Sequence, residues 1–460
     1  MPGWQQRLYA LAPWKVKEWL VAAEALRLNR YRRYGDYEAI RREYAFSRYQ
    51  ELSQEDLRQW QLERLSSLVS YAREHCAFYR DRLPERIETL DELRLIPVLH
   101  KADVREHSTS IPATDFPRNQ LWHDLTSGTT GSPLLFAIGR DGVRIRFAVM
   151  DEYFAFFGCQ YGDRRARFGG QWIVPPSRKT PSFWVYNRVE NQLHMSVYHL
   201  DKSTLPLYIQ KLNQFQPVYM TGYAHVSYLL GQYLCEHGGL TFSPRAVFTD
   251  AEQLLPEYRR TIEQGFGASC YDIYGIRELN WIAVECPRQR YHSLQLSSIL
   301  EVVDDHGQPL SAGQAGHILV TDLTQQAFPF IRYDTGDIGS LSPEGCDCGW
   351  HSVVLQKFEG RVEDLIITPR GRKVTCLVRI PWAGRNITES QIVQTHPDRV
   401  VIRVVPAKGF LPGDMQDMLA VTRELLGEDM RVDWEVVKSI PRTSRGKFKH
   451  IVREHDVPEP

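Results

Sequence analysis

The sequence predicts an α/β protein with a large domain followed by a small C-terminal domain. Its 460 residues are too many for one ordinary hydrophobic core, so two or more domains are expected. From about residue 86 to 350, short apolar runs alternate with helical stretches, as in an α/β region. The same alternation starts again after Gly360, which is therefore the best candidate for a domain boundary.

The composition is typical of a globular protein, with 43% hydrophobic and 24% charged residues. A formal net charge of +0 gives no overall attraction to nucleic acid, so we expect no nucleic-acid partner. No apolar run approaches the roughly 20 residues of a membrane-spanning helix, and the N-terminus lacks the pattern of a secretory signal. Eight cysteines are too few for a disulfide scaffold in a chain of this length. Together these features favour a cytoplasmic protein.

Residues 1–85 are predicted to be mostly helical. Residues 14–26 combine helix formers with apolar positions three and four apart. They lead into a segment that is both basic and aromatic, with Arg27, Arg30, Tyr31, Arg32, Arg33 and Tyr34. Such a segment can rest on an acidic membrane surface or a partner, but we favour an exposed helix packed by its own aromatic residues. A second amphipathic helix is expected from the pattern of residues 61–75, and we expect it to end near Pro84.

Further along the chain, apolar runs bounded by turn residues predict individual strands. The predicted strands are residues 217–222, 246–250, 316–321, 364–368 and 398–405. A helix is predicted over residues 415–426, and the chain then ends in a basic loop.

Residues 126–133, with the sequence Thr-Ser-Gly-Thr-Thr-Gly-Ser-Pro, form a loop that is suited to binding an anion. Five hydroxyl side chains and two glycines disfavour a helix and leave the backbone amides uncovered. Such a loop can turn several N–H groups and hydroxyls toward one phosphate. It lacks the lysine of a Walker A loop. Taken alone, it is equally compatible with an ordinary surface turn.

Four further polar stretches follow, at residues 271–278, 332–337, 359–364 and 441–447. In the second of these, a tight turn is expected to present Asp337. Each stretch alone is compatible with a polar turn, but the order and spacing of all five together indicate a shared function.

As an ordered set, these motifs resemble those of the adenylate-forming superfamily of acyl-CoA synthetases and related ligases. More narrowly, they are similar to the phenylacetate–CoA ligase family, including its CapK-like branch associated with capsular polysaccharide loci. The resemblance runs from roughly Leu62 to the C-terminus. It implies a large multi-layer adenylate-forming domain at residues 86–360 and a small mobile α+β domain at residues 361–460. Residues 1–85 would be a helical extension packed on the large domain.

The resemblance also implies which residues bind ATP. The loop would hold the β- and γ-phosphates, Glu278 would bind the Mg²⁺ that neutralises them, and Asp337 would accept hydrogen bonds from the ribose. Ala251 and Glu252 would line the adenine. The full set of nucleotide contacts comprises Thr126, Ser127, Gly128, Thr129, Thr130, Gly131, Ala251, Glu252, Tyr274, Gly275, Arg277, Asp337 and Arg361.

By the same resemblance, Lys447 is the catalytic lysine that bridges the substrate carboxylate and the α-phosphate. Losing such a partner costs about 3 kcal/mol, or roughly a hundredfold in rate. Glu363 aligns with the hinge about which the small domain rotates before the second half-reaction. Gly222 and Tyr223 would border the acyl pocket. Aromatic residues near 168–172 suggest a flat acid there, although such residues also simply fill cores.

Two positions depart from the pattern. Arg277 stands where many relatives have Thr or Ser, and Ser132 stands where a lysine is frequent. The arginine resembles the CapK-like branch and weakens any assignment of phenylacetate as the substrate. Because Glu278, Asp337 and the other catalytic positions are kept, we expect an active enzyme.

A metal site is also predicted, from Cys286, His292, Cys346 and Cys348. Three thiolates and one imidazole suit a closed tetrahedral Zn²⁺ site, and several family members carry a similar set. The alternative is a group of buried free cysteines. The remaining cysteines, Cys76, Cys159, Cys235, Cys270 and Cys376, are predicted to be core thiols.

Three functions remain open from the sequence. The first is an AMP-forming ligase that activates a carboxylic acid with ATP and passes the acyl group to coenzyme A. The second keeps the adenylation but delivers the acyl group to an amine or hydroxyl, for example on a polysaccharide precursor. The third is a non-catalytic nucleotide-binding scaffold that docks through its N-terminal helices.

Overall fold

Most of the chain is described by the computed structural model. The described residues are 9, 12–117, 120–125, 134–170, 173–175, 178–200, 203–252, 254, 256–359, 366–374, 377, 380, 383–406, 409–440 and 451–454.

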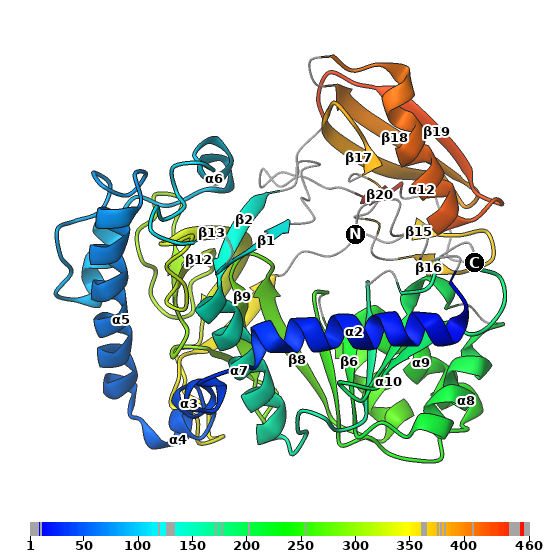
Figure 1. Cartoon of the computed structure of the whole chain (residues 1–460), viewed down its shortest axis with the longest axis horizontal. Helices are drawn as coiled ribbons and strands as arrows, with labels where there is room; N and C mark the ends of the chain where they lie inside the picture. The colour runs from blue at the N-terminus through cyan, green and yellow to red at the C-terminus, as the bar shows by residue number, and fades with distance from the viewer. Residues whose placement is uncertain are drawn as a thin grey trace.

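A twelve-stranded mixed sheet forms the centre of the large domain (Figure 1). In spatial order its strands are β11 (Ser298–Val303), β12 (Gly316–Asp322), β13 (Tyr333–Leu341), β14 (Val354–Glu359), β10 (Tyr291–Ser293), β9 (Asn280–Glu285), β8 (Cys270–Ile276), β7 (Ala246–Asp250), β6 (Tyr219–Tyr223), β3 (Arg165–Gly169), β5 (Gln192–Ser196) and β4 (Trp184–Asn187). The run β5-β3-β6-β7-β8 is parallel, and the other pairs are antiparallel.

The parallel strands are buried because helices cover both of their faces. Side chains alternate along a strand, so Met220 and Val247 face one core while Tyr219 and Phe248 face another. The first core contains α8 (Leu205–Phe215), α9 (Ala224–His237) and α10 (Pro256–Phe266), and the second contains α7 (Arg140–Phe156). Burial on both faces explains why β6 and β7 are continuous apolar runs in the sequence, as predicted.

A third core lies between the antiparallel end of the sheet and α5 (Gln54–His75). The helix begins earlier than predicted because Ser53 caps it: Asp56 N donates to Ser53 Oγ at 3.1 Å, and Ser53 N donates to Asp56 Oδ2 at 2.9 Å. It ends at His75, so the expectation that it continues to near Pro84 is wrong. The Trp60 indole donates to Leu296 O at 3.0 Å and fixes α5 to the sheet.

The remaining elements complete the large domain. They are α2 (Trp14–Arg32), α3 (Tyr37–Glu43), α4 (Arg48–Glu51), η1 (Leu90–Leu95), α6 (Lys101–Glu106), β1 (Leu121–Leu125), β2 (Leu135–Gly139) and η3 (Val197–His199). Strands β1 and β2 pair antiparallel, with Leu125 opposite Leu135. The predicted phosphate loop at residues 126–133 therefore joins two strands whose ends are paired, although the loop itself lies outside the described residues.

A separate four-stranded sheet lies in the C-terminal part of the chain (Figure 1). Its order is β19 (Arg431–Val436), β18 (Arg399–Pro406), β17 (Ile387–His396) and β20 (Ile451–Arg453). Helix α12 (Gln416–Leu426) follows η4 (Pro412–Met415) and buries Met418, Leu425 and Leu426. A two-stranded ribbon, β15 (Ile366–Ile367) and β16 (Lys373–Val374), precedes this sheet.

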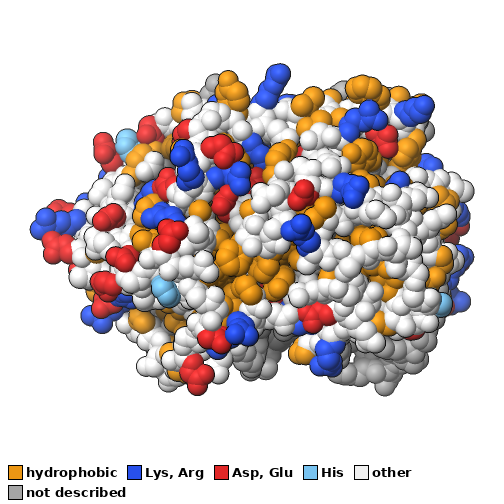
Figure 2. All heavy atoms as spheres, turned by 90° about the horizontal axis from the view of Figure 1, so that it is seen from below, with side chains coloured by type: hydrophobic (Ala, Val, Ile, Leu, Met, Phe, Trp, Pro, Cys, Tyr) orange, Lys and Arg blue, Asp and Glu red, His pale blue; other side chains and the backbone are white. Residues whose placement is uncertain are grey.

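The surface carries charges of both signs, in keeping with the formal net charge of +0. Figure 2 shows Lys and Arg mixed with Asp and Glu over the lower face, around hydrophobic side chains near its middle. Within the described part of the chain, no helix combines the length and the apolar character needed to cross a membrane.

Candidate active site

The predicted site residues gather where the parallel strands end. Gly222 and Tyr223 close β6, Ala251 and Glu252 follow β7, and Tyr274 and Gly275 lie near the end of β8. These strands are neighbours in the sheet and run in the same direction. Ligands of open α/β sheets bind outside such carboxyl ends. The structure thus brings together residues that are far apart in the sequence.

Glu278 is a buried carboxylate in the turn that follows β8, and its side chain is held from two sides. The Tyr333 hydroxyl donates to Glu278 Oε1 at 3.2 Å, and the Lys101 ammonium lies 3.6 Å from the same oxygen. Glu278 as a residue is only 5% exposed. A buried anion of this kind needs cationic or hydrogen-bonding partners, and here it has both.

Asp337 is the second buried carboxylate, and Tyr274 orients it. The Tyr274 hydroxyl donates to Asp337 Oδ2 at 3.0 Å. The prediction that a tight turn presents Asp337 is wrong, because the residue lies inside β13. The register between β12 and β13 is irregular there, because Asp334 pairs with Leu319 while Ile338 pairs with His317. This bulge, and not a tight turn, shapes the backbone at Asp337.

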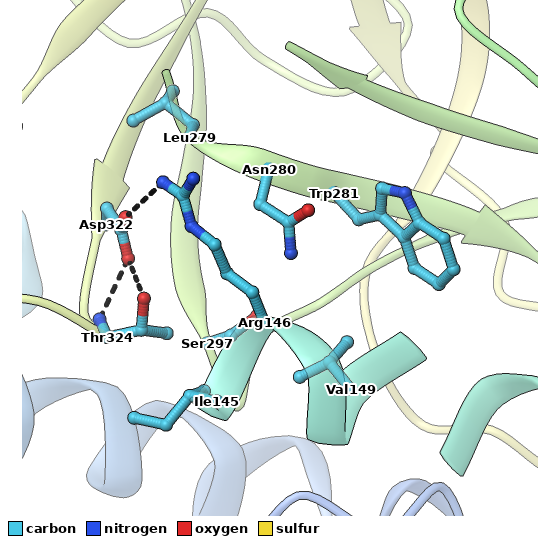
Figure 3. Close-up of a pocket in the computed structure, with 9 residues that line it drawn as sticks. All are labelled: Ile145, Arg146, Val149, Leu279, Asn280, Trp281, Ser297, Asp322 and Thr324. Carbon is cyan, nitrogen blue, oxygen red and sulfur yellow. Dashed lines mark hydrogen bonds and ion pairs between the residues drawn. The ribbon is translucent and has the colours of Figure 1, made fainter. Parts of the chain in front are cut away.

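A largely buried arginine, Arg146, supports the Glu278 turn from the α7 side. Arg146 Nη2 donates to Glu278 O at 2.5 Å, and Nη1 donates to Arg277 O at 3.5 Å. Figure 3 shows its guanidinium directed at Asp322, 3.8 Å away, while Thr324 N donates to Asp322 at 2.8 Å. The adjacent cavity is about 10 Å³, room for no more than about one water molecule, so it is not a substrate pocket.

Arg277 forms a bidentate ion pair that the sequence does not reveal. Its Nε and Nη2 donate to Asp124 Oδ2 and Oδ1 at 3.1 and 2.8 Å. Asp124 belongs to β1, which leads directly into the predicted phosphate loop. Arg277 therefore connects the Glu278 turn to the strand that carries this loop.

Two glycines allow close backbone approaches at the site. A Cβ on Gly222 would lie 2.2 Å from Phe168 O, and a Cβ on Gly275 would lie 2.3 Å from Asn280 O. Any larger residue would force the strands apart at the expected acyl and nucleotide positions.

The expected acyl pocket contains a network of tyrosines around Gly170. Gly170 N donates to the Tyr223 hydroxyl at 2.9 Å, and the Tyr198 hydroxyl donates to Gly170 O at 2.9 Å. Phe168 is fully buried, so it fills the core and does not line an open pocket. Of the other aromatic candidates, Trp172 lies outside the described residues.

The four predicted metal ligands come together. Their ligand atoms all lie within 4.8 Å of one another; Cys286 Sγ is 3.8 Å from Cys346 Sγ, and Cys348 Sγ is 3.3 Å from His292 Nε2. Two sulfur ligands of a tetrahedral zinc ion, each about 2.3 Å from the metal, lie about 3.8 Å apart. The cluster therefore has the dimensions and donor set of a structural metal site.

The electrostatics of this cluster also fit a cation. Burial lowers the pKa of His292 to about 4, so its imidazole is neutral near pH 7. The His292 Nδ1 lies 3.1 Å from Ser352 Oγ, which leaves Nε2 directed at the thiols. Burial raises the pKa of Cys348 to about 12 and also raises the pKa of Cys286, so these two thiols are protonated unless a metal ion stabilises the thiolates.

The other cysteines divide by position. Cys76, Cys159 and Cys270 are buried, as expected of core thiols. The prediction is wrong for Cys235, which is exposed on α9. Cys376 lies outside the described residues.

Several predicted residues also lie outside the described parts of the chain. They are Thr126, Ser127, Gly128, Thr129, Thr130, Gly131, Arg361, Glu363 and Lys447. Their roles remain predictions from the resemblance.

Lys101, Asp124 and Arg146 are site residues that the sequence did not identify. Lys101 reaches Glu278 because Leu99, just before α6, pairs with β13: Leu99 N donates to Arg332 O at 3.0 Å, and Asp334 N donates to Leu99 O at 2.9 Å. A lysine beginning a short helix carries no local signal of such a contact.

Comparison with known proteins agrees with this geometry. Residues 366–454 match a family profile described as the CapK C-terminal domain. The chain is 26% identical over 408 residues to Protein CapK of Staphylococcus aureus, covering 86% of this chain and 89% of that protein. It is 28% identical over 336 residues to the phenylacetate-coenzyme A ligase of Thermus thermophilus, covering 69% and 73% of the two chains.

Among solved structures, the fold is similar to that of 2-hydroxyisobutyryl-CoA ligase in complex with 2-HIB-AMP and CoA. The TM-score is 0.61 at 21% identity, over 89% of this chain and 92% of that chain. The fold is thus that of the adenylate-forming ligases. In sequence, the chain is similar to CapK and to the phenylacetate–CoA ligases over more than two thirds of its length.

Proposed function

We propose that this adenylate-forming enzyme activates a carboxylic acid with ATP and transfers the acyl group to coenzyme A. The observation that carries the proposal is the pair of buried carboxylates, Glu278 and Asp337, each oriented by a tyrosine hydroxyl beside the ends of the parallel strands. Relatives named phenylacetate-coenzyme A ligase support coenzyme A as the acceptor.

Asp337 is suited to the ribose of ATP. An ionised carboxylate can accept from both ribose hydroxyls at once, provided that it is held in one orientation. Tyr274 provides that orientation through its bond to Oδ2. Ala251 and Glu252, on the neighbouring strand end, would then lie beside the base.

Glu278 offers the hard anionic oxygen that Mg²⁺ prefers, so the residue fits the metal. Bound Mg²⁺ would neutralise charge on the phosphates. Arg146 fixes the main chain of this turn through Glu278 O, and Lys101 places a second positive charge beside the carboxylate. The phosphate loop lacks a lysine at Ser132, and we propose that Lys101 supplies positive charge toward the phosphates instead.

Lys447 would hold the substrate carboxylate and the α-phosphate together. The carboxylate then attacks the α-phosphorus, the bond to pyrophosphate breaks, and the acyl-adenylate forms. After rotation about Glu363, the acceptor would attack the acyl carbon and release AMP.

A second acceptor class has support of its own. The profile matched by residues 366–454 is that of the CapK C-terminal domain, and Protein CapK is similar to this chain over 86% of its length. The small domain would meet the acceptor in the second half-reaction. Because the CapK-like branch is associated with capsular polysaccharide loci, we propose an amine or hydroxyl acceptor as the alternative to coenzyme A.

Carboxylate-dependent exchange of pyrophosphate into ATP tests the first half-reaction. Across a broad panel of acids, we expect at least one acid to support exchange by the wild type. Lys447→Ala should reduce that exchange roughly a hundredfold, and Glu278→Gln should raise the Mg²⁺ requirement. Lys438→Ala, which removes an exposed lysine of the same domain, is the matched control and should leave exchange unchanged.

Failure of every acid to support exchange, with ATP binding intact, would contradict the catalytic proposal and favour a nucleotide-binding scaffold. Once an acid is known, coenzyme A and amines or sugar hydroxyls can compete for its adenylate. Preferential formation of the thioester supports the first acceptor, and formation of an amide or ester supports the second.

A further inference from the structure

Helix α2 has its polar and apolar faces reversed. A helix on a protein surface normally turns its apolar stripe toward the core. In α2 the buried residues are instead Lys17, Ala22 and Ala25. Its large apolar side chains point outward: Trp19 is 68% exposed and Leu26 is 56% exposed. In the basic segment that follows, Tyr34 is also exposed, so the expectation that the aromatic residues of that segment pack the helix is wrong for Tyr34.

The exposed apolar residues form one stripe. Val16, Trp19 and Leu20 are spaced three and four residues apart, which places them on a single face of the helix. Tyr34, just beyond the C-terminal end of α2, is 66% exposed. In Figure 1, α2 lies as one straight rod across the front of the large sheet. Its 19 residues give a length of about 28 Å.

Positive charge accompanies this stripe. Lys15, Arg27 and Arg30 are exposed on α2, and the Arg188 guanidinium lies 5.7 Å from the centre of the Trp19 ring. The exposed carboxylate of Glu24 pairs with Arg27 at 2.6 Å and neutralises it, so the excess positive charge comes from Lys15, Arg30 and Arg188. The chain as a whole has a formal net charge of +0, so this positive face is a local feature.

We propose that the outer face of α2 docks on an anionic lipid bilayer, a role beyond the ligase activity. A straight helix that exposes Trp, Leu and Val together with Lys and Arg matches the requirements of a helix lying in a membrane interface. The indole of Trp19 has the amphipathic character that favours the headgroup region. Lys and Arg beside it add attraction to anionic headgroups that a neutral surface does not give.

Co-sedimentation of the full chain with vesicles tests the proposal. We expect binding to vesicles of phosphatidylcholine containing phosphatidylglycerol, and roughly tenfold weaker binding to vesicles of phosphatidylcholine alone. Trp19→Glu combined with Leu20→Glu should abolish binding. Arg27→Gln combined with Arg30→Gln should remove only the additional binding that anionic lipid gives. The vesicle binding that remains in this double variant should not change with added salt.

Leu411→Glu is the matched control, since Leu411 is 66% exposed but belongs to the C-terminal part of the chain. This variant should bind vesicles as the wild type does. Thermal unfolding of each variant checks that the fold is kept, which is expected because the substituted side chains are exposed. Absence of vesicle binding by the wild type would overturn the proposal. A second result would also overturn it: light scattering shows that the wild type self-associates, and the Trp19 and Leu20 substitutions abolish this self-association without changing vesicle binding.

Discussion

At the scale of single residues, the site depends on hydroxyl groups that orient carboxylates. Tyr274 and Tyr333 each donate to one acid, Asp337 and Glu278 respectively. Neither tyrosine needs to touch a substrate to matter, because a carboxylate that can rotate loses part of its preorganisation. These tyrosines are therefore positioning residues.

Tyr274→Phe tests this role. We expect the KM for ATP to rise about tenfold or more while kcat changes less, since a hydrogen bond to a charged group contributes about 1.5 kcal/mol or more. Steady-state kinetics at varied ATP concentration measure both constants. Tyr153→Phe removes another buried hydroxyl, which donates to Glu285 O at 2.7 Å, and is the matched control. An equal change in KM for both variants would mean that the effect is general destabilisation.

The carboxylates could be recognised from the sequence, but their partners could not. Glu278 and Asp337 lie within ordered motifs that carry the family resemblance. Lys101, Asp124 and Arg146 reach the site through strand pairing and helix packing, so their roles depend on contacts between distant parts of the chain. No local pattern of residues encodes those contacts.

At the scale of elements, the cysteine–histidine cluster fastens the β9–β10 hairpin to the segment before β14. Cys286 and His292 come from the hairpin, while Cys346 and Cys348 come from that segment. Trp350 N donates to Cys348 Sγ at 3.3 Å, and its ring lies edge-on to His292 at 5.4 Å. A metal ion here would lock these loops in place.

We expect purified protein to contain about one zinc ion per chain by elemental analysis. Cys348→Ser should lose the metal and lower the melting temperature by several degrees, because metal binding favours only the folded state. Cys235→Ser changes an exposed cysteine outside the cluster and should do neither. Zinc affinity should fall with falling pH, since the thiols must lose protons to bind. A zinc-free wild type of equal stability would remove the site.

Element positions show where sequence reasoning succeeds. The runs at 217–222 and 246–250 became β6 and β7 because strands covered on both faces are continuously apolar. The residues around Asp337 were harder to interpret, since a bulge inside a strand and a turn between strands favour the same Thr-Gly-Asp composition.

At the scale of the whole molecule, buried histidines couple stability to pH. Burial lowers the pKa of His194 to about 3 and that of His199 to about 4, with smaller effects from nearby arginines. In the unfolded chain both would titrate near 6.5. Below that pH the unfolded chain binds more protons than the folded chain, so stability falls as the pH falls.

The loss should reach about 1.4 kcal/mol per pH unit for each histidine between about pH 6.5 and its folded pKa. Asp272 and Glu285 act in the opposite direction, because burial raises their pKa values to about 6 and about 7. A variant comparison separates the two effects. Free energies of unfolding of the wild type and of His194→Gln are measured in denaturant from pH 7 to pH 5. As the pH falls, the stability of the variant relative to the wild type should rise, by up to about 1.4 kcal/mol per pH unit. Identical slopes would contradict this account.

A series of hydrogen bonds connects the C-terminal part of the chain to the expected acyl pocket. Arg372, which follows the predicted hinge, donates from Nη1 to Tyr198 O at 2.6 Å. The Tyr198 hydroxyl donates to Gly170 O, and Gly170 N donates to the Tyr223 hydroxyl beside the expected acyl pocket. If the C-terminal part rotates between half-reactions, this link must break. We expect the acyl pocket to be most rigid in the domain orientation that keeps the Arg372–Tyr198 hydrogen bond. The enzyme would then discriminate between carboxylic acids in that orientation, and the other orientation would add no further selection.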